Sequence, residues 1–323
     1  MVLKDHFMPQ KMMRKVIYAL SPLLLFSIWM YGWRVLLLLA VVSIFGVGAE
    51  YFIMRSIQGE KVKVTESVLV TCLLFTLTLP PATPFYVAVI GILVGVIFGK
   101  GVFGGFGRNI FNPALVGRCF IYVCFPRHLT MRWTEPFLSF PGGFAAFDGG
   151  VDAITSSTPM IAMEAGEAAP DLGTLILGTH AGSMGETMVI LILLAAVYLA
   201  LTKTASWEIM VASMGSGLIF TSIFKLAGAN VPPIHAAVLT GGLLFASVFM
   251  ATDPVSAPKE DESKWIVGAL IGLFSATIRV FGLFTEGAMF AILIANALTP
   301  LIDRSIKELK AQAKAKVEKE AEV

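Results

Sequence analysis

Apolar runs of nearly membrane-spanning length alternate with short polar connectors along most of the chain. A helix needs about 20 apolar residues to cross a bilayer, so runs near that length predict transmembrane helices. Five runs come first: Val16–Tyr31, Val35–Met54, Ser67–Leu79, Phe85–Phe98 and Ile110–Phe125. Five more follow a long polar interval: Thr187–Leu201, Trp207–Leu226, Ile234–Met250, Trp265–Val280 and Leu283–Leu298. The pattern predicts an all-α polytopic membrane protein with about ten transmembrane helices.

The composition indicates lipid as the main surroundings of the chain. Charged residues make up 14% of it and hydrophobic residues 56%, whereas a soluble domain carries about 25% charge. The pattern divides the chain into a first membrane repeat (1–125), a polar loop (126–186), a second membrane repeat (187–302) and a charged tail (303–323). We expect the lipid bilayer as a partner and no nucleic acid.

Lysine and arginine residues gather in the N-terminal segment, in alternate connectors and in the tail. The positive-inside rule places such segments in the cytoplasm. We therefore expect both termini to be cytoplasmic. The loop 126–186 follows five predicted spans and should be extracytoplasmic.

The two halves of the chain contain similar proline-rich segments. Leu79-Pro80-Pro81 precedes a glycine-rich span and Asn112, and Val231-Pro232-Pro233 precedes a later span and Asp253. The diprolines lie 152 positions apart, and the order of the motifs pairs Asn112 with Asp253. Because each half has five spans, the second copy would lie upside down. The sequence thus predicts two inverted five-helix repeats.

The polar loop contains the segment Asp152-Ala153-Ile154-Thr155-Ser156-Ser157-Thr158-Pro159. A hydroxyl followed by proline is typical of a helix start, with Thr158 as the N-cap. A functional interpretation is also physically sound, because an exposed threonine hydroxyl is accessible to a transferase. A phosphate esterified there would face the positive end of the helix dipole. The pattern alone leaves both interpretations open.

The segment from Asp152 to Thr158 resembles the flavinylation motif Asp-x-x-Ser/Thr-x-x-Thr, whose last threonine receives FMN through a phosphoester. Gly107-Arg108-Asn109-Ile110-Phe111-Asn112-Pro113-Ala114-Leu115 and Met250-Ala251-Thr252-Asp253-Pro254 resemble other motifs of the same family. That family contains the D subunit of Rnf complexes (ferredoxin:NAD oxidoreductases) and the B subunit of sodium-pumping NADH:quinone oxidoreductases. The resemblance covers nearly the whole chain, and the short segment before the first span is closer to the Rnf subunit. Ser156 and Ser157 stand where the family often has glycine and alanine.

The resemblance implies covalent FMN on Thr158, with Asp152, Ser156 and Ser157 beside it, and allows a second, non-covalent flavin such as riboflavin. It implies a flavin transferase for maturation, the other subunits of an Rnf complex as partners, and a bacterial or archaeal cytoplasmic membrane as the location. The expected function is that of an electron-transfer subunit in a translocase that couples electron flow between ferredoxin and NAD to sodium or proton movement. Two alternatives stay open, a quinone-reductase subunit and a stand-alone channel or transporter for a small solute.

Three polar residues near the predicted spans are candidates for an ion pathway: Asp253, Asn112 and Glu50. A carboxylate at the centre of a transmembrane helix costs about 2.5–3.5 kcal/mol on insertion scales and therefore suggests a role. For Asp253 a helix cap at the membrane rim is the structural alternative. The cysteine and histidine spacings predict no metal site, and no NAD-binding or iron–sulfur motif is recognisable. We therefore expect no catalytic residue in this chain and an electron donor and acceptor on partner subunits.

Overall fold

The computed structural model describes residues 7–59, 63–131, 133–147, 158–164, 166–229, 231, 233–240, 242–282 and 286–321. Regular structure in this part of the chain is almost entirely helical. The exception is a parallel pair of two-residue strands, β1 (Phe7–Met8) and β2 (Val64–Thr65). Six of the described helices are long and apolar enough to cross a membrane. The prediction of an all-α polytopic membrane protein is confirmed.

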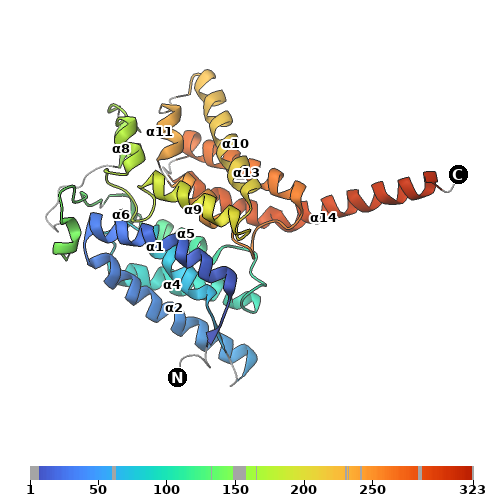
Figure 1. The fold of residues 1–323 in the computed structure, drawn as a ribbon, viewed down its shortest axis with the longest axis horizontal. Coiled ribbons are helices and arrows are strands. Elements are labelled where there is room, and N and C mark those ends of the chain that lie inside the picture. Colours follow the sequence, from blue (N-terminus) through green and yellow to red (C-terminus); the bar gives the residue numbers. More distant parts are fainter. Residues whose placement is uncertain are drawn as a thin grey trace.

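The two halves of the chain form two neighbouring groups of helices (Figure 1). The first half contains α1 (Lys11–Tyr31), α2 (Arg34–Gln58), α3 (Ser67–Leu77), α4 (Phe85–Gly99), the 3-10 helix η1 (Gly101–Phe103) and α5 (Pro113–Cys124). The connecting segment contains α6 (Pro126–Thr130), the 3-10 helix η2 (Gly142–Ala145), α7 (Pro159–Glu164) and α8 (Leu172–Leu177). The second half contains α9 (Val189–Leu201), α10 (Trp207–Leu226), α11 (Ile234–Leu239), α12 (Leu243–Phe245), the π-helical segment η3 (Ala246–Met250), α13 (Asp261–Phe281) and α14 (Gly287–Ala321).

The connecting segment and the charged tail lie at different ends of the molecule (Figure 1). Helices α6 and α8 lie on the left of the view, and the C-terminal part of α14 projects to the right. We call these ends the loop side and the tail side. They are the ends at which the sequence predicts the extracytoplasmic and cytoplasmic faces.

The transmembrane segment expected at Ile234–Met250 is broken in the structure into α11, α12 and η3. Gly242 between them has a φ of 71°, a left-handed conformation that glycine adopts without a steric penalty. The tail departs from expectation in the opposite way, because α14 continues through Pro300 to Ala321. The helix therefore continues without a break across the expected boundary between the last span and the charged tail, at residues 302 and 303.

The helices of the two halves pack in the same order. Helix α2 packs against α4 and α4 against α5, while α10 packs against α13 and α13 against α14. The short helix α3 then corresponds to the broken segment from α11 to η3. A shift of 174 positions relates several pairs of identical residues, among them Trp33 and Trp207, Thr78 and Thr252, Pro80 and Pro254, and Pro84 and Pro258.

The repeat register expected from the two diprolines is wrong. Pro80-Pro81 follows α3, whereas Pro233 lies at the start of α11, in the segment equivalent to α3; Pro232 lies outside the described residues. The two pairs of prolines thus occupy opposite ends of equivalent segments. With the shift of 174 positions, Asn112 corresponds to Glu286, and Asp253 to Leu79 instead of to Asn112.

Backbone hydrogen bonds join the two halves where α3 ends. The N–H groups of Gly185 and Met184 donate to the carbonyl oxygens of Leu77 and Leu79, at 2.7 and 3.1 Å. The hydroxyl of Ser27 on α1 donates to the carbonyl of Met184. A helix that ends inside a bilayer leaves carbonyl groups unpaired, each at a cost of several kcal/mol in hydrocarbon. The segment before α9 supplies the donors that the end of α3 needs.

Gly272 of α13 lies directly against α10, and we predict that a methyl group at this position destabilises the protein. A Cβ atom there would collide with the hydroxyl of Ser216 and the backbone of Gly217. Overpacking of this kind costs about 1–3 kcal/mol, so Gly272→Ala should lower the melting temperature of the detergent-solubilised protein. Gly215→Ala on α10 is the matched control, because a Cβ atom there meets nothing within 4 Å. Equal melting temperatures for the two variants would contradict this packing.

Candidate functional site

Thr158 lies at the start of α7, as the helix-cap interpretation predicts. Its side-chain oxygen accepts a hydrogen bond from the N–H of Ile161 at 3.4 Å. Its carbonyl accepts one from the N–H of Ala162 at 2.9 Å. The side chain is half-buried, so Thr158 can serve as the cap and still present its oxygen to a modifying enzyme.

The other predicted flavin-site residues, Asp152, Ser156 and Ser157, lie outside the described residues. Their expected place beside Thr158 therefore rests on the motif. Of the motif, only its last residue, Thr158, is described.

A pocket on the loop side adjoins Thr158. Pro159, Met160 and the buried indole of Trp133 form an apolar part of its lining. Gly182 lies on another part of the lining, where a Cβ atom would approach Thr187 to 2.7 Å. A threonine hydroxyl beside an apolar and aromatic wall suits the ribityl phosphate and the flat ring system of FMN. The described residues thus fit the expected cofactor.

His180 lines the same pocket as a neutral imidazole. Burial lowers its pKa below the usual value. Its Nδ1 atom lies 3.1 Å from the carbonyl oxygen of Ala181, and because a carbonyl only accepts, Nδ1 carries the proton. Nε2 then has a free electron pair, and it has no hydrogen-bond partner among the described residues.

Arg118 of α5, which is only 2% exposed, contacts two acids that line this pocket, Glu186 and Glu286. Its guanidinium donates through Nε to Glu286 Oε2 at 3.1 Å and lies 3.4 Å from Glu186 Oε1 through Nη1. Nη1 also donates to the carbonyl of Thr78 at the end of α3. One cation thus connects the first half of the chain to two acids beyond it in the sequence.

A second pocket opens towards the tail side, between the two halves. Two ion-pathway candidates, Asn112 and Asp253, line it together with the aromatic rings of Phe106 and Phe249. Asn112 caps α5, because its Oδ1 accepts from the N–H of Ala114 at 3.0 Å. Its Nδ2 donates to a carbonyl of the other half, that of Met250, at 3.3 Å.

Asp253 stabilises the turn that follows η3. Its Oδ2 accepts from the hydroxyl of Ser256 at 2.9 Å, and its Oδ1 lies 3.5 Å from the N–H of Val255. The side chain therefore has the local structural role that the cap interpretation expects. It also lines the pocket, so the structure leaves it available for the ion-pathway role.

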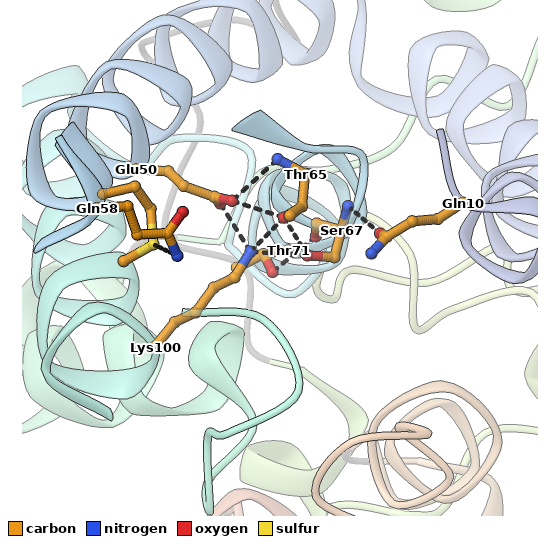
Figure 2. A network of polar contacts seen from close by, with 8 residues as sticks. Gln10, Glu50, Gln58, Thr65, Ser67, Thr71 and Lys100 are labelled. Atoms are coloured by element: carbon orange, nitrogen blue, oxygen red, sulfur yellow. Dashed lines mark hydrogen bonds and ion pairs between the residues drawn. The ribbon is translucent and has the colours of Figure 1, made fainter. Parts of the chain in front are cut away.

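Glu50, the third candidate, belongs to a buried polar network behind this pocket (Figure 2). The ammonium of Lys100 donates to Glu50 Oε2, Thr65 Oγ1 and Ser67 Oγ at 2.7, 2.8 and 2.7 Å. Glu50 Oε1 accepts from the N–H and the hydroxyl of Thr65 at 3.1 and 2.5 Å. The three donors of the ammonium are therefore all used, and Lys100 supplies the positive charge that Glu50 needs.

The sequence analysis assigned no site role to Lys100 or Arg118. Lys100 follows the predicted span Phe85–Phe98, yet its side chain is 3% exposed and lines the pocket of Asn112 and Asp253. Arg118 stands alone among apolar residues from Pro113 to Cys124. An isolated cation in an apolar run is the signal that could have identified it, since such a residue needs a buried partner.

Comparison with known proteins identifies the family of this chain. A family model described as "NQR2, RnfD, RnfE family" matches residues 3–312. The chain belongs to this family. The family resemblance inferred from the motifs is thereby confirmed.

Relatives of two kinds match the chain. The B subunit of the Na(+)-translocating NADH-quinone reductase of Pseudomonas paraeruginosa is 40% identical over 254 residues, which are 76% of this chain and 60% of that protein. The D subunit of the ion-translocating oxidoreductase complex of Halorhodospira halophila is 32% identical over 321 residues, 92% of this chain and 89% of that protein. The chain thus spans about three fifths of the Pseudomonas family member and most of the Halorhodospira one.

We predict that Glu50 and Lys100 are strongly coupled in stability. Glu50→Gln leaves a buried ammonium without its counter-charge, and Lys100→Met leaves a buried carboxylate, at a cost of about 3–5 kcal/mol each. The double variant Glu50→Gln/Lys100→Met removes both charges and should lose much less stability than the two single variants together. The measurement is thermal unfolding of the four proteins in the same detergent. Additive losses would show that the ion pair is not formed.

Proposed function

We propose that this chain is a membrane electron-transfer subunit that carries FMN esterified to Thr158 in an Rnf-type complex. The complex would couple electron flow between ferredoxin and NAD to the movement of sodium ions or protons. The observation that carries the proposal is Thr158 itself, a half-buried hydroxyl beside an apolar and aromatic pocket wall. The family, and the relative from an ion-translocating oxidoreductase complex, support it.

The described residues of the pocket would bind and orient the flavin. FMN, when bound, supplies one- and two-electron redox chemistry at this point of the chain. The ester oxygen of Thr158 would hold the phosphate at the start of α7, and Trp133 and Met160 would offer apolar surface to the ring system. Asp152 would act earlier, by positioning the metal or the substrate of the flavin transferase.

The tail-side pocket is the place we propose for a second, non-covalent flavin. Apolar and aromatic side chains, among them Phe106 and Phe249, form much of its lining, and Asn109, Asn112 and Asp253 supply a few polar groups. Ligand pockets commonly combine mainly apolar walls with a few placed polar groups. A flavin here would lie on the opposite side of the chain from Thr158.

Exposed aromatic side chains on the connecting segment support a place within a larger complex. Phe140, Phe144 and Phe147 are 90%, 43% and 56% exposed. Apolar surface of this kind is typical of contacts with other subunits. Partner subunits of the Rnf complex would cover it and would carry the electron donor and acceptor.

A quinone-reductase complex is the second candidate for the assembly. The 40% identity to a Na(+)-translocating NADH-quinone reductase protein of Pseudomonas paraeruginosa favours it. The two candidates share the flavin on Thr158 and differ in the acceptor, which is NAD in one and a quinone in the other. Assay of the purified complex with ferredoxin and NAD, or with NADH and a quinone, separates them.

We predict that the protein carries flavin that survives denaturation. Co-expression with a flavin transferase should give a fluorescent band on a denaturing gel, and Thr158→Ala should abolish the fluorescence because it removes the esterified oxygen. Ser156→Ala and Ser157→Ala are matched controls that remove neighbouring hydroxyls. They should keep the fluorescence. A dark wild-type band, with the transferase active on a control substrate, would refute the covalent flavin.

We predict that Asp253→Asn impairs ion movement while electron transfer continues. Asparagine keeps a side-chain oxygen for the turn with Val255 and Ser256 but removes the negative charge from the tail-side pocket. The measurement is sodium and proton uptake by vesicles that contain the complex, together with the rate of electron transfer. Normal ion transport at a normal electron-transfer rate would remove Asp253 from the pathway.

A further inference from the structure

The inner end of the loop-side pocket holds two carboxylates against one guanidinium. Glu186 and Glu286 both face Arg118, and their side chains are only 13% and 14% exposed. Glu286 receives two of the Arg118 donors, Nε and Nη2, whereas Glu186 lies at 3.4 Å from Nη1. Arg118 is therefore committed mainly to Glu286, and Glu186 is the less neutralised acid.

The remaining charged and titratable groups around Glu186 act on it at longer range. The positive charge of Arg279 on α13 stabilises the ionised form of Glu186. Its guanidinium donates to the carbonyls of Ala237 and Thr240 near the end of α11. Burial lowers the pKa of His180 and so disfavours its charged form. A buried carboxylate that shares its guanidinium with a second acid favours the binding of a proton or another cation.

Unpaired electron-pair donors converge on the same space. The hydroxyl oxygen of Thr187, in a residue 2% exposed, has no hydrogen-bond partner among the described residues. The Nε2 atom of His180 is likewise unpaired there. Both residues line the pocket together with Glu186 and Glu286. Buried polar atoms are nearly always paired in proteins, so the oxygen of Thr187 and Nε2 of His180 are available as neutral ligands for a cation that binds the carboxylate.

We infer that Glu186 binds one exchangeable monovalent cation, a proton or a sodium ion, at the inner end of the Thr158 pocket. Glu186 supplies the charge, Thr187 a neutral oxygen ligand, and Arg118 holds Glu286 in place beside them. The role of this site rests on the proposed function, because an electron on a flavin at Thr158 adds negative charge that the cation offsets. The binding itself needs only the residues of this chain.

The test uses the full chain in nanodiscs of neutral lipid, produced without the flavin transferase. Infrared difference spectra are recorded while sodium is exchanged for choline at constant pH, and while the pH is changed without sodium. A carboxyl band that responds to sodium identifies a sodium site, and one that responds to pH alone identifies a proton site. Glu186→Gln should lose the responding band.

Two further variants make the test decisive. Glu66→Gln is the control, because Glu66 lies next to the start of α3, pairs with Arg14 at 2.6 Å and should leave the responding band intact. Thr187→Val keeps the shape and removes the hydroxyl, and it should weaken cation affinity roughly threefold to tenfold. If Glu186→Gln does not fold, the cation affinity of Thr187→Val tests the inference instead. An unchanged band in Glu186→Gln, or unchanged affinity in Thr187→Val, overturns the inference, whereas a missing flavin on Thr158 would refute only the proposed function.

Discussion

The pairing of backbone groups inside the membrane is the constraint on which this structure depends. Hydrocarbon offers no hydrogen bonds, so each helix that ends within the bilayer must find partners for its last carbonyl groups. At the end of α3 the segment before α9 supplies backbone N–H groups to Leu77 and Leu79, and Arg118 supplies a donor to Thr78. At the end of η3 the donor is Asn112, which reaches the carbonyl of Met250 from the first half. The ends of α3 and η3 are therefore both completed by donors from other parts of the chain.

The same breaks determine where chemistry is possible. A continuous transmembrane helix presents only side chains to its surroundings, but the end of a broken helix brings polar groups into the interior. One pocket lies by the end of η3, where Asn112 and Asp253 meet, and the other by the segment that completes α3, where Glu186 and Thr187 follow Gly185. The shift of 174 positions relates Asn112 to Glu286, so equivalent helix starts line opposite pockets. The structure thus has one polar pocket towards the tail side and one towards the loop side.

Much of this architecture is predictable from the sequence, and the reasons for the exceptions are physical. Hydropathy predicts Trp207–Leu226 as a span, and α10 has these bounds. It does not predict the break at Gly242, because the pair Gly241-Gly242 in the sequence is compatible with a continuous helix until tertiary contacts select the left-handed conformation of Gly242. The partners of Lys100 and Arg118 are also beyond a local pattern, since they lie as far as 168 positions away in the chain. The diprolines misled the register because proline begins and ends helices equally well.

The two pockets differ in how their acids are neutralised, and this difference bears on ion movement. Behind the tail-side pocket, the ammonium of Lys100 is a fixed cation. It donates hydrogen bonds to oxygen atoms of Glu50, Thr65 and Ser67, which could otherwise bind a mobile ion. A mobile ion cannot use these ligands unless Lys100 leaves, so Asp253 is the acid that remains accessible on that side. At the loop side one guanidinium contacts two carboxylates, and Glu186 makes the weaker contact of the two. If the chain binds mobile cations as we propose, Asp253 and Glu186 are better candidates than Glu50, and they line the tail-side pocket and the loop-side pocket respectively.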